Sequence, residues 1–171
     1  MIGLLHPVPS RRKTREFVLQ VLFAADAQGK DPLQVLDSLA HHFESEQDEV
    51  LKLGRVTQDF AAGLISAVSR DRQAIDELIS RLSHHWKLHR MSRVDRSVLR
   101  MAIAEMTGFP EIPERVTLNE AVDLAKRYGT ENSGAFVNGI LDRIRELQGS
   151  DSLNRSPADL LAELDESYPT D

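Results

Sequence analysis

The chain has 171 residues, of which 41% are hydrophobic, a size and composition that suit one globular domain with its own core. Its formal net charge of −6 excludes a generally basic nucleic-acid coat protein. It contains no cysteine, which excludes disulfides, thiolate metal sites and cysteine nucleophiles. No apolar run approaches the roughly 20 residues needed to cross a membrane, so we expect a cytoplasmic protein with no membrane contact.

The hydrophobic residues recur with helical spacing, so the sequence predicts an all-α, single-domain bundle of about seven helices. Gly29 and Gly149 stand where the first and last of these helices should stop. Thr117 and Glu120 have the spacing of a capping box, which predicts that another helix begins there. The helices are expected, in chain order, over residues 10–28, 32–43, 48–69, 71–88, 92–108, 117–128 and 133–147.

The chain after the predicted bundle differs in composition. We expect a domain over residues 1–149 and an acidic C-terminal extension over 150–171. Residues 151–171 hold one arginine against six Asp and Glu, a net charge of −5. Ser156 and Pro157 could start one more short helix. Such a helix could fold back over a basic patch, or the extension could be frayed.

A basic cluster stands at the start of the first predicted helix, made of Arg11, Arg12, Lys13 and Arg15. Cations there oppose the partial positive charge of a helix N-terminus, and each typically costs about 0.3–1 kcal/mol if exposed. A bound phosphate reverses the sign, because cations and free backbone N–H groups both converge on it. The cluster therefore favours binding of an anionic ligand at one local site, and the alternative is a basic N-terminus that is simply solvated.

A second basic stretch covers residues 81–100, which hold six Lys and Arg against the single acid Asp95. Arg93, Arg96 and Arg100 fall on one side of a predicted helix. Such a stripe is usually solvent-exposed, but it could also extend an anion-binding surface or pair with acidic neighbours. The sequence has no phosphate-binding loop, dinucleotide fingerprint or recognisable catalytic set, so we expect no enzymatic activity, no metal and no cofactor.

Several sequence blocks, in the same order and at the same spacing over residues 10–147, resemble the NusB family of transcription antitermination factors. Their joint occurrence is far more specific than any one of them. The blocks are Arg11–Glu16 leading into Val21–Phe23, Val94–Arg100, Asn119–Lys126 followed by Tyr128–Gly129, and Ser133 followed by Phe136–Asp142.

The resemblance implies an all-helical, non-enzymatic protein that binds the boxA element of ribosomal RNA leaders. It implies two partners, the ribosomal protein NusE and an RNA polymerase antitermination complex that suppresses premature termination. It also implies which residues contact RNA: Arg11, Arg12, Lys13, Arg15, Asn132, Ser133 and Phe136. Asn132 and Ser133 fall at a helix start that favours phosphate, and Phe136 lies at the edge of an apolar face, where it could stack on a base or pack in the core.

Leu19 and Phe23 form a second apolar face on the first predicted helix. This face could dock NusE, dock a second copy of the chain as a homodimer, or pack against another helix. Two other functions stay open: a protein-interaction adaptor whose arginines are merely solvated, and an RNA-holding module related to the N-terminal domain of RNA cytosine methyltransferases. RNA affinity would distinguish the adaptor from the RNA-binding factor.

Overall fold

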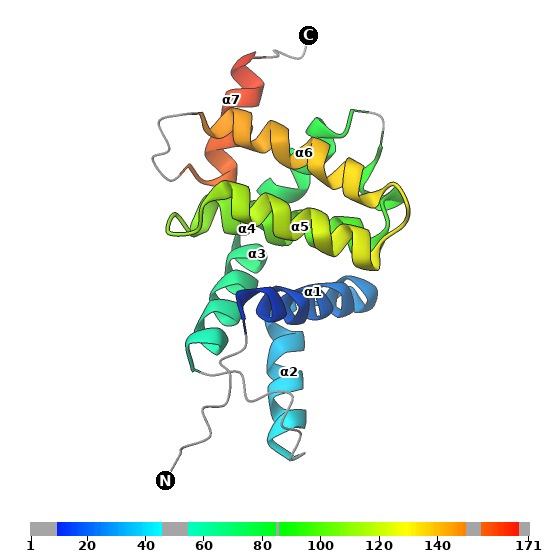
Figure 1. Cartoon of the computed structure of the whole chain (residues 1–171), viewed down its shortest axis with the longest axis vertical. Helices are drawn as coiled ribbons and strands as arrows, with labels where there is room; N and C mark the ends of the chain where they lie inside the picture. Colours follow the sequence, from blue (N-terminus) through cyan, green and yellow to red (C-terminus); the bar gives the residue numbers. More distant parts are fainter. Residues whose placement is uncertain (1–9, 46–54, 85, 150–154, 168–171) are drawn as a thin grey trace.

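The computed structural model describes residues 10–45, 55–84, 86–149 and 155–167, and these ranges contain helices and no strand (Figure 1). The all-α prediction is confirmed. The elements are α1 (Arg11–Gln28), α2 (Pro32–Ser45), α3 (Arg55–Leu82), the 3-10 helix η2 (Leu88–Arg90), α4 (Arg93–Gly108), α5 (Glu114–Tyr128), α6 (Ser133–Gln148) and α7 (Pro157–Ser167). Every helix in these ranges is too short or too polar to cross a membrane.

Local sequence determines both ends of α1. The Ser10 hydroxyl accepts a hydrogen bond from the backbone N–H of Lys13, a normal N-terminal cap. Gly29 has a φ of +63°, the left-handed conformation that glycine adopts at little cost, and it ends the helix as predicted. The basic cluster is therefore held on the first turn of a well-defined helix.

Three predicted boundaries are wrong. The helices expected over 48–69 and 71–88 are one continuous helix from residue 55, with 46–54 outside the described residues. This helix ends at residue 82 and not at 88, and residues 88–90 form the separate 3-10 helix η2. Asp71 does not cap a new helix, because its carboxylate accepts hydrogen bonds from the Arg70 side chain within the helix. Likewise α5 begins at Glu114, and the Thr117 hydroxyl donates to the Glu105 carboxylate on α4. A tertiary partner thus replaces the expected capping box.

The core forms around α4, which packs against α1, α3, α5 and α6. Twelve of its sixteen residues are buried, so this helix is covered on nearly all sides. In Figure 1, α5 and α6 lie side by side in front of it, and α1 runs below α5. This arrangement places the N-terminal cations of α1 next to α5.

The helix predicted in the acidic extension is present as α7, which packs against α3, α4 and α6. Leu160 is fully buried there, and Asp165 forms an ion pair with Arg81 of α3. Figure 1 shows α7 on the far side of α5 and α6 from α1. The described part of the extension is therefore neither frayed nor folded over the basic cluster.

Candidate nucleic-acid interface

Three cations of the basic cluster are exposed on the first turn of α1: Arg11, Arg12 and Lys13. The guanidinium of Arg11 lies 5.1 Å from the centre of the Phe60 ring, within the range of a cation–π contact. Arg12 donates a hydrogen bond of 3.1 Å to the Asp123 carboxylate of α5. Tertiary contacts therefore orient two of these three side chains before any ligand arrives.

Arg15, by contrast, is buried, and the expectation that it is an exposed helix-start cation is wrong. Its guanidinium makes hydrogen bonds of 2.8 and 2.6 Å with the two carboxylate oxygens of Glu105, and it lies 5.6 Å from the Phe60 ring centre. Thr117 donates to the same carboxylate at 2.6 Å. Arg15 thus supports the surface from below, because α1 turns this position towards α4.

The second predicted segment lies at the start of α6. Asn132 is exposed at the N-terminal cap position, and its side chain makes no capping hydrogen bond. Ser133 is buried, and its hydroxyl accepts a hydrogen bond of 2.8 Å from the Thr130 backbone N–H. Phe136 is half-buried and packs against the core, as its edge position predicts. Asn132 and Phe136 are accessible here, whereas Ser133 shapes the turn.

The last turn of α5 lies between the two predicted segments. Arg127 forms an ion pair of 2.9 Å with Glu16 on α1. At α6, a Cβ added to Gly134 would lie 2.7 Å from the Cγ of Lys126, so any larger residue at 134 would displace the Lys126 side chain. Lys126 and Arg127 were not among the predicted site residues. Both lie in the last turn of a helix, where cations are common because they interact favourably with the helix dipole. Their sequence position was therefore only a weak indication of a role in RNA binding.

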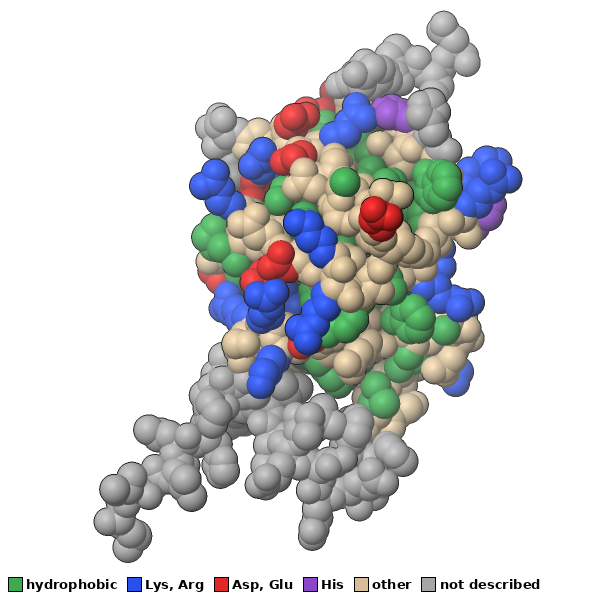
Figure 2. Space-filling model, turned by 45° about the vertical axis from the view of Figure 1, so that its right-hand side comes forward, with side chains coloured by type: hydrophobic (Ala, Val, Ile, Leu, Met, Phe, Trp, Pro, Cys, Tyr) green, Lys and Arg blue, Asp and Glu red, His purple; other side chains and the backbone are tan. Residues whose placement is uncertain are grey.

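Acidic side chains alternate with the cations along the contact between α1 and α5. Glu120 and Asp123 both face Arg12, at 4.0 and 3.1 Å, and Glu16 faces Arg127. Figure 2 likewise shows Lys and Arg side chains interspersed with Asp and Glu. A phosphate that binds here must compete with carboxylates for the same guanidinium groups.

An apolar groove of about 290 Å³ continues this surface towards the C-terminal half of α1. Leu19 is buried at 6% exposure, while Phe23 and Tyr128 are 40% and 44% exposed. Internal packing therefore accounts for Leu19 but leaves Phe23 on the surface. The lining residues are Glu16, Leu19, Gln20, Phe23, Val94 and Tyr128.

The arginine stripe on α4 pairs with acidic neighbours and is largely buried. Arg96 and Arg100 both donate to the carboxylate of Asp26, with shortest distances of 2.5 and 2.7 Å, and Arg100 also donates to Asp76. Burial alone would raise the pKa of Asp26, but the hydrogen bonds from the two arginines lower it below its ordinary value. Arg93 is half-exposed and lies 3.7 Å from the same carboxylate.

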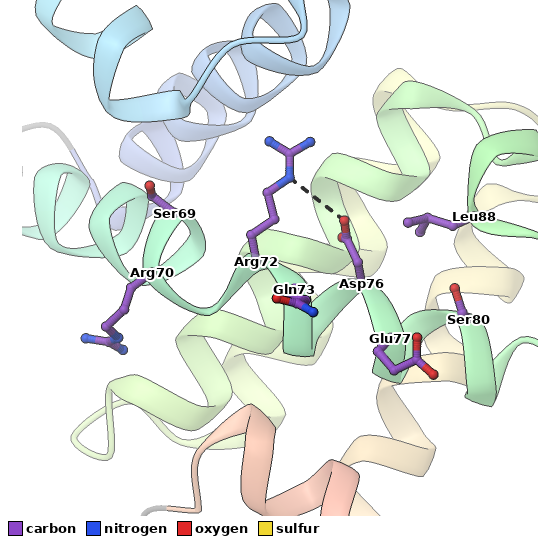
Figure 3. A pocket seen from close by; sticks show the side chains of 8 residues that line it. All are labelled: Ser69, Arg70, Arg72, Gln73, Asp76, Glu77, Ser80 and Leu88. Carbon is purple, nitrogen blue, oxygen red and sulfur yellow. Dashed lines mark ion pairs between the residues drawn. The ribbon is translucent and has the colours of Figure 1, made fainter.

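A wider hollow of about 660 Å³ opens along α3, and Figure 3 shows the side chains that line it. Arg72 points towards Asp76, 3.8 Å away, and Arg70 points out of the hollow, where Asp71 pairs with it. These two cations are matched by carboxylates. The hollow therefore offers an anion no surplus charge, in contrast to the first turn of α1.

The NusB family model matches residues 12–146, which include most of the basic cluster, the end of α5 and the start of α6. The chain belongs to the NusB family. The transcription antitermination protein NusB of Desulforapulum autotrophicum is 42% identical over 141 residues, which cover 82% of this chain and 94% of that protein. The NusB of Sorangium cellulosum is 44% identical over 140 residues, with coverages of 82% and 94%.

Solved NusB structures share the fold. A crystal form of T. maritima NusB is 37% identical in sequence, with a TM-score of 0.70, and the match covers 90% of this chain and 98% of that one. A chain in a crystal structure of the antitermination factors NusB and NusE in complex with double-stranded RNA is 25% identical, with a TM-score of 0.66 and coverages of 80% and 96%. The NusB fold thus extends over most of this molecule.

Proposed function

We propose that this protein is a non-enzymatic transcription antitermination factor in the cytoplasm. It binds boxA-type RNA of ribosomal RNA leaders together with NusE, and the pair joins a complex on RNA polymerase that suppresses premature termination. The similarity to NusB antitermination proteins over about four-fifths of the chain supports this function. The likeness to a NusB chain crystallised with NusE and RNA supports the two partners.

One observation carries the RNA part of the proposal: three exposed cations occupy the first turn of α1, where the helix dipole disfavours positive charge and favours a bound anion. Among the described residues, carboxylates pair only with Arg12 of the three. Arg11, Arg12 and Lys13 contact phosphates. Asn132 adds a contact at the start of α6, and Phe136 stacks on an unpaired base. Arg15 and Ser133 are buried, so they hold this surface in shape and do not themselves reach the RNA.

NusE docks in the groove beside this surface. An exposed aromatic rim over a buried leucine is the usual form of an interface anchor, and Phe23, Tyr128 and Leu19 provide it. Glu16 lines the groove, and its partner Arg127 lies between the two segments proposed to bind RNA, so both ligands would meet along one edge of the molecule. A second copy of the chain is the competing occupant of the same groove.

The decisive experiment is a salt titration of binding to a short single-stranded boxA-type RNA, with and without NusE. The log–log slope should be about −2 to −3, at roughly 0.7 per neutralised phosphate. Replacing Arg11, Arg12 and Lys13 by Gln should remove most of this slope. The melting temperature should stay nearly unchanged, because relief of the helix dipole offsets the loss of the Arg11–Phe60 contact and the Arg12–Asp123 ion pair. The matched control replaces Arg143 and Arg145, two exposed cations on α6, and should retain most of the affinity.

Equal binding of a scrambled RNA, or equal binding by the triple-Gln variant, would reject the RNA surface and favour the adaptor function. The groove is tested separately with Phe23→Ser, which should weaken NusE binding, and with Leu33→Ser, an equally exposed apolar residue on α2, which should not. Analytical ultracentrifugation of the same variants distinguishes NusE docking from a homodimer. If Phe23→Ser changes only the sedimenting mass, the groove is a self-association surface.

A further inference from the structure

The proposed function does not use the cationic turn formed by residues 86–91, between α3 and α4. It contains Trp86, whose exposure of 52% exceeds that of every other large hydrophobic residue whose side chain the structure describes. Lys87, His89 and Arg90 are also exposed, and within the described parts of the chain no carboxylate pairs with them. In a chain with a net charge of −6, this turn is a local surplus of positive charge around an aromatic ring.

The body of the protein holds residues 88–91 of this turn in place. Arg96 donates hydrogen bonds to the backbone carbonyls of Leu88 (2.8 Å) and Met91 (3.2 Å), and Arg96 is itself held by Asp26. Leu88 packs against the core, and Met91 is buried at 4% exposure. The apolar residues of the turn are therefore used internally. Among residues 86–91, the exposed side chains are therefore the aromatic and basic ones.

We propose that this turn is a second contact for single-stranded RNA, in which a base stacks on Trp86 while Lys87 and Arg90 bind the adjacent phosphates. The inference rests on the proposed function and adds a site to it. An exposed aromatic beside cations suits unpaired nucleotides, because every base has a face that can stack. A protein partner, which Trp86 and Arg90 could also serve, fits less well because the exposed residues around the ring are all basic and the turn adds no continuous apolar patch.

The position of the turn indicates which part of the RNA it would bind. Val94, a few residues beyond η2, lines the same groove as Tyr128, and the chain from Tyr128 leads directly to Asn132 at the start of α6. In Figure 1, the connection from α3 to α4 and the connection from α5 to α6 both lie at the right-hand end of the molecule. The turn therefore lies at the end of the molecule where Asn132 lies, and it would hold nucleotides flanking the boxA element.

The chain offers a direct probe, because Trp86 is its only tryptophan. A boxA-type RNA with about ten unpaired nucleotides on each side, long enough for one more contact, is titrated into the full-length protein. Tryptophan fluorescence and the anisotropy of the labelled RNA are recorded together. Stacking on Trp86 should quench the fluorescence, and the quench should saturate at the same RNA concentration as the anisotropy.

Variants then separate the ring from the charges. Trp86→Ala should weaken binding of the flanked RNA about fivefold or more, Trp86→Phe should weaken it less, and neither should affect a boxA RNA without flanks. Replacing Lys87 and Arg90 by Gln should lower the salt slope by about 1.4, for two phosphates. The Arg143 and Arg145 double-Gln variant is the matched control for lost charge.

Two outcomes would overturn the second site while leaving the proposed function intact. One is RNA binding by anisotropy with unchanged tryptophan fluorescence and full affinity in Trp86→Ala. The other is a fluorescence change caused by NusE alone and not by RNA, which would assign the turn to the protein partner. If the wild-type protein shows no RNA binding in either signal, with or without NusE, the proposed function itself fails.

Discussion

The guanidinium of Arg15 and the carboxylate of Glu105 form a two-pronged ion pair inside the bundle, with side chains only 4% and 1% exposed. The pair connects the first turns of α1, which carry the exposed cations, to the central helix α4. Thr117 completes it by donating a hydrogen bond from α5. Three helices therefore meet beneath the proposed RNA surface through one carboxylate.

Breaking this pair from either side should destabilise the fold strongly. Arg15→Met leaves the buried Glu105 carboxylate without its cation, and Glu105→Gln leaves the buried Arg15 guanidinium without its anion. Either change typically costs about 3–5 kcal/mol. The double variant Arg15→Met with Glu105→Leu should recover much of that loss, because two apolar side chains leave no buried charge. Urea denaturation of the four proteins measures both effects. Single variants that lose less than about 1 kcal/mol would contradict the structural role of Arg15.

Removing the carboxylate that faces Arg12 should strengthen RNA binding. Asp123→Asn frees the guanidinium and removes a negative charge beside the incoming phosphate, and an exposed pair of this kind is typically worth about 0.2–1 kcal/mol. The expected gain is therefore up to about fivefold in affinity at low salt, fading as salt rises. Asp142→Asn on α6, whose carboxylate pairs with Arg145 at 3.0 Å, is the matched control. Equal gains in both variants would indicate a general charge effect.

The stability provided by Asp26 should disappear in acid. Its pKa in the folded protein is lowered from 3.8, so it favours the folded state above that ordinary value and loses this effect as the pH falls through the folded pKa. Asp26→Asn should cost about 3 kcal/mol at pH 7, and the difference from wild type should shrink below about pH 4. Urea denaturation at pH 7, 5 and 3 checks this. An undiminished difference at pH 3 would contradict it, and the exposed Asp165→Asn serves as control.

The sequence predicted the features of this protein that depend on neighbouring residues. The ends of α1 follow from Ser10 and Gly29, and the half-buried position of Phe136 follows from helical periodicity. The predictions failed where the deciding partner is remote in sequence. Arg15 and Lys13 are both cations of the same cluster and Lys13 is exposed, yet Arg15 is buried because it forms an ion pair with Glu105, 90 positions away.

The same reason explains the errors at Thr117 and the arginine stripe. Thr117 has the spacing of a capping residue, but Glu105 on another helix accepts its hydrogen bond. Arg96 and Arg100 have the spacing of a solvent-exposed stripe, but Asp26 lies 70 or more positions away and pairs with both. Lys126 and Arg127 were overlooked because only the tertiary structure places them beside the predicted site residues. There α5 packs against α6, and side-chain ion pairs connect α5 to α1.

Replacing Phe136 separates its two roles. A fully buried Phe→Ala change typically costs about 3–5 kcal/mol, so a half-buried ring should cost about 2 kcal/mol of folding free energy. If Phe136 stacks on a base, Phe136→Ala should in addition weaken RNA binding by about 1–3 kcal/mol, measured well below the melting temperature. Phe136→Leu retains most of the packing and loses the planar ring, so its stability should be nearly normal while its affinity falls. A Phe136→Leu variant with normal affinity would show that the ring serves only the core, and the RNA surface would then end at Asn132.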